Sequence, residues 1–73
     1  MLSADSKIKQ LMKNPEALAI LEEYNPGIST EPQMKMVYGL TLRKLVGFPQ
    51  SKAAGWTDEK LEEVDAKLRA IEE

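Results

Sequence analysis

The hydrophobic positions of this chain recur at helical spacing in short blocks, each bounded by residues that typically begin or end helices. The clearest block covers residues 14–27, where Asn14 is suited to cap a helix and Pro15 to occupy its first turn. The Asn-Pro-Gly sequence at 25–27 is suited to end the helix and reverse the chain. The apolar residues between these signals keep helical spacing: Ala17, Ile20, Leu21 and Tyr24. We therefore predict a helix over residues 15–24.

Two more helices are predicted on either side of this block. The first covers about residues 6–13, and its apolar face consists of Ile8, Leu11 and Met12. The other begins near residues 31–32, because Thr30 and Gln33 have the spacing of a capping box. Its inner face consists of Met34, Val37 and Tyr38. Gly39 is expected to end it, and we expect Gly27 or Gly39 to adopt a positive φ.

The second half of the chain predicts two further helices. Thr41 can cap a helix over residues 42–48, which would end at Pro49 and whose buried side would hold Leu42, Leu45 and Val46. Residues 50–55 are small and polar, and we predict a loop there. Thr57 can cap the longest helix, residues 58–71, and Trp56 before it is placed to pack onto Leu61.

These elements predict an all-α fold, a compact bundle of about four to five short helices with the C-terminal one longest. No segment shows sustained strand alternation, and neither repeats nor low-complexity tracts occur. The 73 residues are 42% hydrophobic and 30% charged, which is typical of a folded chain and of a single small domain over residues 1–73.

The composition argues against several kinds of chemistry. The chain has no cysteine and no histidine, so it lacks the residues of disulfides, thiolate or imidazole metal sites and Ser–His pairs. Its four glycines do not form a phosphate-binding loop. We therefore expect no enzymatic activity, no cofactor and no metal. The chain shows neither a signal peptide nor an apolar run of membrane-spanning length, which favours the cytoplasm and argues against a membrane partner.

The last predicted helix has two possible uses for its apolar stripe. Its apolar residues are spaced by 3, 4 and 3 positions: Leu61, Val64, Leu68 and Ile71. This is the spacing of a core-facing stripe and also of a coiled-coil seam. Two heptads are few for a coiled coil, so packing within a monomer is favoured, and a dimer remains the alternative.

Acidic side chains form a row beside that stripe. The row consists of Asp58, Glu62 and Asp65. Carboxylates in such a row could hold a hard cation. However, Arg69 follows Asp65 by four positions and Lys67 follows Glu63 by four, as in solvated ion pairs. We therefore predict a solvated face.

Charge is unevenly distributed along the chain. No acidic residue occurs between Glu31 and Asp58, whereas residues 58–73 hold seven acidic and three basic residues. The middle segment carries four cations, which could bind an anionic partner such as nucleic acid or an acidic protein: Lys35, Arg43, Lys44 and Lys52. The simpler interpretation is that the basic middle and the acidic last helix complement each other, which argues against nucleic acid.

Some apolar side chains do not fit the predicted core faces. Met34 and Met36 are two positions apart, so they cannot both face the same core, and Leu18 lies off the stripe of its helix. Together with Phe48 or Trp56, Leu18 and Met36 could form a docking patch for a protein partner. Alternatively, all four line a core wrapped on several sides. A weaker hypothesis is sugar binding by the aromatic side chains of Trp56, Tyr24 and Tyr38.

The chain resembles a small helical module found at the ends of bacterial sugar-active hydrolases, such as β-glucosidase-like and esterase-like enzymes. The residues that carry the resemblance are Ile8 and Leu11, the 14–17 run Asn-Pro-Glu-Ala, the 20–27 run, Pro32 and Met34, Thr41, Leu42 and Leu45, and finally Leu61, Val64, Asp65, Ala66 and Leu68. The resemblance implies a non-catalytic accessory or protein-interaction module of a carbohydrate-active hydrolase.

The first half of the chain, residues 8–27, has a second resemblance. It is similar to a domain of unknown function found beside hybrid-cluster and iron–sulfur repair proteins. That family often continues into a cysteine pair, where this chain has Ile28, Ser29 and Thr30. Neither resemblance implies catalytic residues in this chain.

Overall fold

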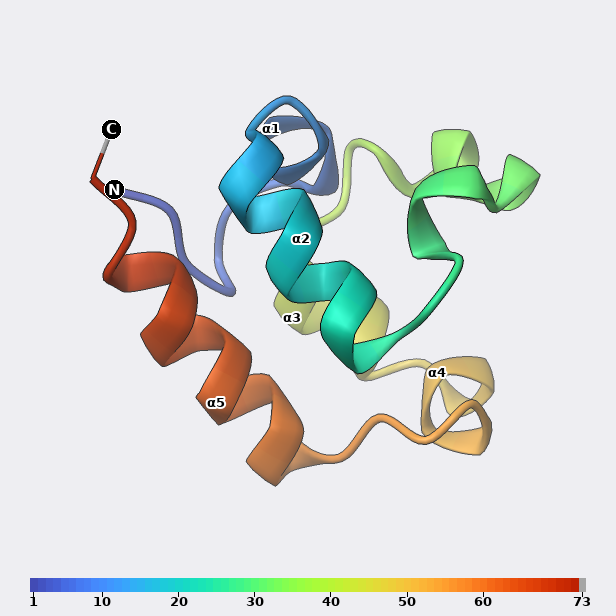
Figure 1. Ribbon diagram of the computed structural model, residues 1–73. Helices are drawn as coiled ribbons and strands as arrows, with labels where there is room; N and C mark the ends of the chain where they lie inside the picture. Colours follow the sequence, from blue (N-terminus) through green and yellow to red (C-terminus); the bar gives the residue numbers. More distant parts are fainter. Residues whose placement is uncertain (73) are drawn as a thin grey trace.

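The computed structural model describes residues 1–72, with every side chain among them except that of Gln33. It is helical, as predicted, and the described residues form no β-strand, only an isolated antiparallel bridge between Lys7 and Thr41 (Figure 1). Five α-helices and two 3₁₀ helices follow one another in the order α1 (Ile8–Met12), α2 (Pro15–Tyr24), η1 (Ile28–Thr30), η2 (Pro32–Val37), α3 (Leu42–Val46), α4 (Pro49–Ala53) and α5 (Asp58–Arg69).

The predicted bounds of α2 are confirmed at both ends. The side chain of Asn14 accepts hydrogen bonds from the backbone N–H groups of Glu16 (2.9 Å) and Ala17 (3.1 Å), while Pro15 occupies the first turn. After the helix, Gly27 adopts a φ of 88°, which is in the left-handed region where glycine is favoured. Gly39 does not have a positive φ, so Gly27 alone meets that prediction.

The helix predicted to begin near residues 31–32 is a 3₁₀ helix. Its six residues span Pro32–Val37, and Tyr38 and Gly39 lie in the turn that follows. Met34 and Val37 are three positions apart, so they share a face in a 3₁₀ helix as well as in an α-helix. The spacing could not distinguish the two. The hydroxyl of Thr30 donates to the carbonyl of Gly27 at 3.0 Å, whereas the predicted part of Gln33 in a capping box lies outside the described side chains.

The loop predicted over residues 50–55 is instead mostly the helix α4, so that prediction is wrong. Pro49 occupies the first turn of this helix, where its missing N–H costs nothing, and does not act as a stop signal. The preceding helix α3 ends at Val46, two residues before the predicted end. The predicted caps of α3 and α5 are confirmed, because the hydroxyls of Thr41 and Thr57 accept from the N–H groups three residues ahead.

The core lies between α2 and α5, which run side by side in opposite directions (Figure 1). Helix α1 packs on α2, and α3 packs on α5. The apolar stripe of the last helix faces inward, which is the core alternative for that helix. The buried hydrophobic residues are Leu2, Ala4, Ile8, Leu11, Ala17, Leu21, Ile28, Met34, Leu42, Val46, Trp56, Leu61, Val64, Leu68 and Ile71.

The N-terminal segment is held against α5 by a buried carboxylate. The N–H of Ala4 donates to Oδ1 of Asp65 at 2.7 Å, and Nε of Arg69 donates to Oδ2 of Asp65 at 2.9 Å. Asp65 is only 9% exposed. The Asp65–Arg69 pair was therefore predicted correctly. The prediction of a solvated face is confirmed for Asp58, Glu62 and Arg69, which are exposed, and is wrong for Asp65, whose carboxylate is covered where Ala4 donates to it.

Candidate functional site

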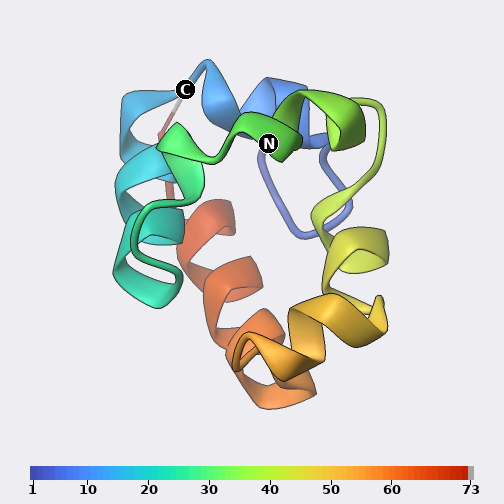
Figure 2. The ribbon, with the colours of Figure 1, turned by 90° about the vertical axis from the view of Figure 1, so that its right-hand side faces the viewer.

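The structure has an apolar groove of about 410 Å³ between the η1–η2 segment and the corner formed by α3 and α4. Figure 2 shows this side of the molecule, with the green η1–η2 segment above and the orange α4 below. The apolar side chains that line it are Ile28, Met34, Met36, Val37, Leu45, Phe48, Ala54 and Trp56. We use the name "apolar groove" for this site. Its volume falls within the range of ligand-binding sites in proteins.

Met36 and Phe48 are the large exposed apolar side chains of the groove. Met36 is 84% exposed and Phe48 is 39% exposed. In a 3₁₀ helix, successive residues are about 120° apart. The turn that directs Met34 and Val37 toward the core therefore directs Met36 toward solvent. Phe48 lies at the N-cap of α4, where the following proline keeps its backbone extended. Both positions are therefore set by local backbone geometry.

Trp56 belongs to the buried wall of the groove. It is 6% exposed, and its ring stacks on Tyr24 with 6.3 Å between centroids and 20° between planes. The Nζ atom of Lys67 lies 4.8 Å from the centroid of the Tyr24 ring. A sugar-stacking platform needs an open aromatic face. Because Trp56 is covered, the structure does not support the sugar-binding hypothesis.

Three of the four predicted docking residues meet in this groove. Met36, Phe48 and Trp56 all line it, although they come from three different segments of the chain. Leu18 does not line the groove and is half-buried on α2. Met34, Val37 and Leu45 were predicted as core residues only. The wall contributed by Gln50, Ser51 and Ala54 was missed because α4 was predicted as a loop.

Few polar residues line the groove, and the side chain of one of them already forms a hydrogen bond within the protein. The hydroxyl of Ser51 donates to the carbonyl of Leu45 at 2.6 Å, which ties α4 to α3. Asn25, Glu31 and Gln50 also line the groove. Among residues 1–72, no group of three or more acidic, histidine or cysteine side chains is placed to hold a metal ion. The groove is therefore suited to apolar contacts.

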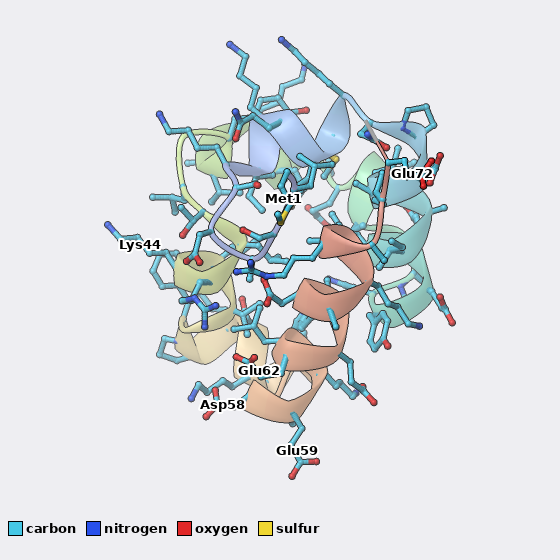
Figure 3. The ribbon with its side chains drawn as sticks, turned by 90° about the vertical axis from the view of Figure 1, so that its left-hand side faces the viewer. Met1, Lys44, Asp58, Glu59, Glu62 and Glu72 are labelled. Atoms are coloured by element: carbon cyan, nitrogen blue, oxygen red, sulfur yellow. The ribbon has the colours of Figure 1, made fainter. Side chains whose placement is uncertain are left out.

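The four predicted anion-binding cations are distributed over three elements. Lys35 lies on η2, Arg43 and Lys44 on α3, and Lys52 on α4, and all four are exposed. Figure 3 shows Lys44 extending from α3 away from α5. Part of this positive charge is already balanced within the molecule.

Arg43 is the cation whose charge is balanced by acidic side chains of the same molecule. Its Nε lies 3.0 Å from Oδ1 of Asp5, and its Nη1 lies 3.5 Å from Oε1 of Glu62. The hydrogen bond that Arg43 donates to the carboxylate of Asp5 is the main cause that raises the pKa of Arg43. The contact with Glu62 agrees with the prediction that the basic middle complements the acidic last helix. Lys67 pairs with Glu23 of α2 at 3.6 Å, and not with the predicted Glu63.

Glu22 organises the chain reversal that leads into the groove. Its carboxylate accepts hydrogen bonds from the N–H of Gly27 (2.8 Å) and of Ser29 (2.9 Å), and from the Ser29 hydroxyl. The Ser29 hydroxyl is the main cause that lowers the pKa of Glu22, and the two backbone N–H groups add to it. These bonds fix η1, whose Ile28 lines the groove. The sequence contains no local signal for this role, because the partners are five and seven residues away.

Within the part of the chain that the structure describes, no helix has the length and apolar character needed to cross a membrane. Comparison of the chain with protein-family models, curated proteins and solved structures finds no match.

Proposed function

We propose that this chain is a non-catalytic protein-interaction module, and that its apolar groove receives apolar side chains of a partner protein. The observation that carries the proposal is the position of Met36, a large apolar side chain that is 84% exposed at the edge of a groove with other apolar walls. Single exposed apolar residues are common, but an exposed pair beside an apolar hollow is typical of an interaction site.

The energetics favour a docking role for these side chains. Burying an exposed methionine side chain contributes about 1.5–3 kcal/mol, and Phe48, which is 39% exposed, adds a smaller amount, so together they offer part of a micromolar affinity. Methionine also adapts its shape readily, and both Met34 and Met36 line the groove. A small number of such anchors usually dominates the binding energy of an interface.

The setting that we propose is that of an accessory module. The resemblance to modules at the ends of sugar-active hydrolases supports this setting, and so does the absence of histidine and cysteine from the whole chain. In this proposal, the partner surface belongs to such an enzyme or to another protein. The alternative anion-binding function is less favoured, because Arg43 already contacts Asp5 and Glu62.

The four methionine methyl groups allow a direct test. The probe is a synthetic amphipathic peptide with an apolar stripe and glutamine on its polar positions, added to protein with ¹³C-labelled methionine methyls. We expect the methyl signals of Met34 and Met36 to shift, because both line the groove, while those of Met1 and Met12 stay in place. Shifts of Met12 alone, or no shift at all, would contradict the proposal.

Two variants give the matched comparison. Met36→Ala should weaken binding of this peptide by about tenfold or more, since truncating an anchor typically costs more than 1 kcal/mol. Leu18→Ala should leave the affinity unchanged, because Leu18 lies outside the groove. Equal losses in both variants would indicate a general effect on the fold and would count against the groove.

A further inference from the structure

The charge around the apolar groove points to the chemistry of its partner. We propose that the groove binds an amphipathic helix whose apolar stripe is flanked by acidic side chains. This inference rests on the proposed function and adds to it the charge and the secondary structure of the bound segment.

The architecture favours a helical partner segment. Partner peptides commonly bind either by extending the edge of a sheet or by laying a helix into an apolar groove. Residues 1–72 contain no sheet whose edge could be extended, since the Lys7–Thr41 bridge is isolated. The groove is apolar and carries an exposed methionine, which is the kind of surface used by helix-in-groove binding.

The segment that forms most of the groove is free of acidic residues. Every lining residue from Met34 to Trp56 belongs to the stretch of sequence between Glu31 and Asp58, which contains four cations and no acidic residue. Arg43 is balanced by Asp5 and Glu62. The charges that remain are exposed lysines: Lys35, Lys44 and Lys52.

Each of these lysines is the immediate neighbour of a lining residue. Lys35 lies between Met34 and Met36, and the other two lysines adjoin Leu45 and Ser51. Adjacent Cα atoms are about 3.8 Å apart, whereas the Debye length at physiological salt is about 8 Å. The Cα atoms of the three lysines therefore lie within a Debye length of the Cα atom of a lining residue, and the long flexible side chain lets each ammonium group turn toward a partner that fills the groove. Among the described residues, Glu31 is the carboxylate that lines the groove.

A second copy of this chain does not offer the required helix. Its acidic helices are α2, with three acidic and no basic residues, and α5. Both bury their apolar faces against each other in the core. The acidic partner helix in this proposal therefore belongs to a different protein.

Three peptides of equal length test the inference. They share one apolar stripe and carry glutamate, glutamine or lysine at the flanking positions. We expect the glutamate peptide to bind about tenfold more tightly than the glutamine peptide at low salt, because several exposed ion pairs each add a small favourable contribution there. The lysine peptide should bind most weakly. At about 0.5 M salt the three affinities should converge, because screening removes the difference.

A charge variant of the protein provides the control. In the triple variant Lys35→Gln, Lys44→Gln and Lys52→Gln, the glutamate peptide should bind only as tightly as the glutamine peptide. The affinity for the glutamine peptide itself should not change, because none of the three lysines lines the groove.

The outcomes separate this inference from the proposed function. Equal affinities for the glutamate and glutamine peptides at low salt, with shifts of the Met36 methyl in both, would overturn the acidic partner and keep the docking function. No methyl shift with any peptide would overturn both. Binding of a single-stranded oligonucleotide that depends on the lysines but leaves the Met36 methyl unchanged would assign the lysines to nucleic acid, and would also overturn the inference.

Discussion

The backbone N–H of Ala4 donates a 2.7 Å hydrogen bond to the carboxylate of Asp65, which lies 61 positions further along the chain. The same carboxylate accepts a hydrogen bond from Arg69. Around it, the carbonyls of Ala4 and Ser6 accept from the N–H groups of Arg43 (2.8 Å) and Leu42 (3.2 Å) at the start of α3. The N-terminal segment thus joins α3 to α5, and Asp65 is the side chain that secures it.

Replacement of Asp65 by asparagine should destabilise the protein by about 1–3 kcal/mol at pH 7, because a hydrogen-bonded charge is lost from a buried position. The hydrogen bond from Ala4 is the main cause that lowers the pKa of Asp65, and Arg69 adds to it. A lowered pKa in the folded state contributes stability above the ordinary value, about 3.9. That contribution is lost as the pH falls through the folded pKa.

Urea unfolding at pH 7 and near pH 2–3 measures this effect. The difference between the wild type and Asp65→Asn should shrink at the lower pH. Glu63→Gln, which removes an exposed carboxylate from the same helix, should change little at either pH. A difference between wild type and Asp65→Asn that is equally large at both pH values would contradict the role of the charge.

Gly27 and Gly39 form a matched pair for testing backbone strain. Gly27→Ala should destabilise the fold by about 1 kcal/mol or more, because a φ of 88° is unfavourable for any residue with a Cβ atom. Gly39→Ala should be close to neutral, since its φ is not positive and nothing lies within 4 Å of an added Cβ. Thermal unfolding followed by circular dichroism compares the two, and similar losses in both variants would count against the strain at Gly27.

The fluorescence of Trp56, the single tryptophan, measures how far its ring is buried. Trp56→Ala should destabilise the protein by about 3–4 kcal/mol, because the ring is almost fully covered and stacked on Tyr24. In the wild type, iodide should quench the fluorescence of Trp56 far less than that of the urea-unfolded chain. A fully accessible indole, together with a near-neutral alanine variant, would show that the ring is open to ligands.

The Glu22 carboxylate gives a second pH-dependent prediction. Glu22→Gln should lower the melting temperature at pH 7, because Gly27 and Ser29 would donate to a neutral amide oxygen in place of a carboxylate. Since the folded pKa of Glu22 is lowered, its contribution is present above about pH 4.3 and is lost as the pH falls through the folded pKa. The neighbouring Glu23→Gln is the control, and a larger effect there would contradict the role assigned to Glu22.

Local signals explain which elements could be predicted from the sequence. The bounds of α2 depend on Asn14, Pro15 and the Asn-Pro-Gly reversal, all of which act within a few residues. The kind of helix at η2 could not be predicted, because Met34 and Val37 satisfy two periodicities. Helix α4 was missed because a proline can end one helix and begin the next, and five residues carry too short a pattern to decide.

The candidate site depends on long-range packing to a greater degree than the helices do. The spacing of Met34 and Met36 was sufficient to predict that they cannot both face the same core, but it did not decide that Met36 is exposed. Nothing local indicated that Met36 would meet Phe48 and Trp56, since they are separated by 12 and 20 positions and are brought together by the α3–α4 corner. For the same reason the burial of Asp65 was not predicted, because its partner Ala4 is at the other end of the chain.

The contact between the first residues and α5 also constrains the order of folding. During synthesis, α5 leaves the ribosome after every element that it covers, so Ala4 and the face of α2 that packs on α5 lack these partners until it emerges. Small helical proteins usually fold quickly because most of their contacts are local. Here the closing contacts join residues about 60 positions apart, and we expect the nascent chain to gain its cooperative structure only once α5 is free of the ribosomal tunnel.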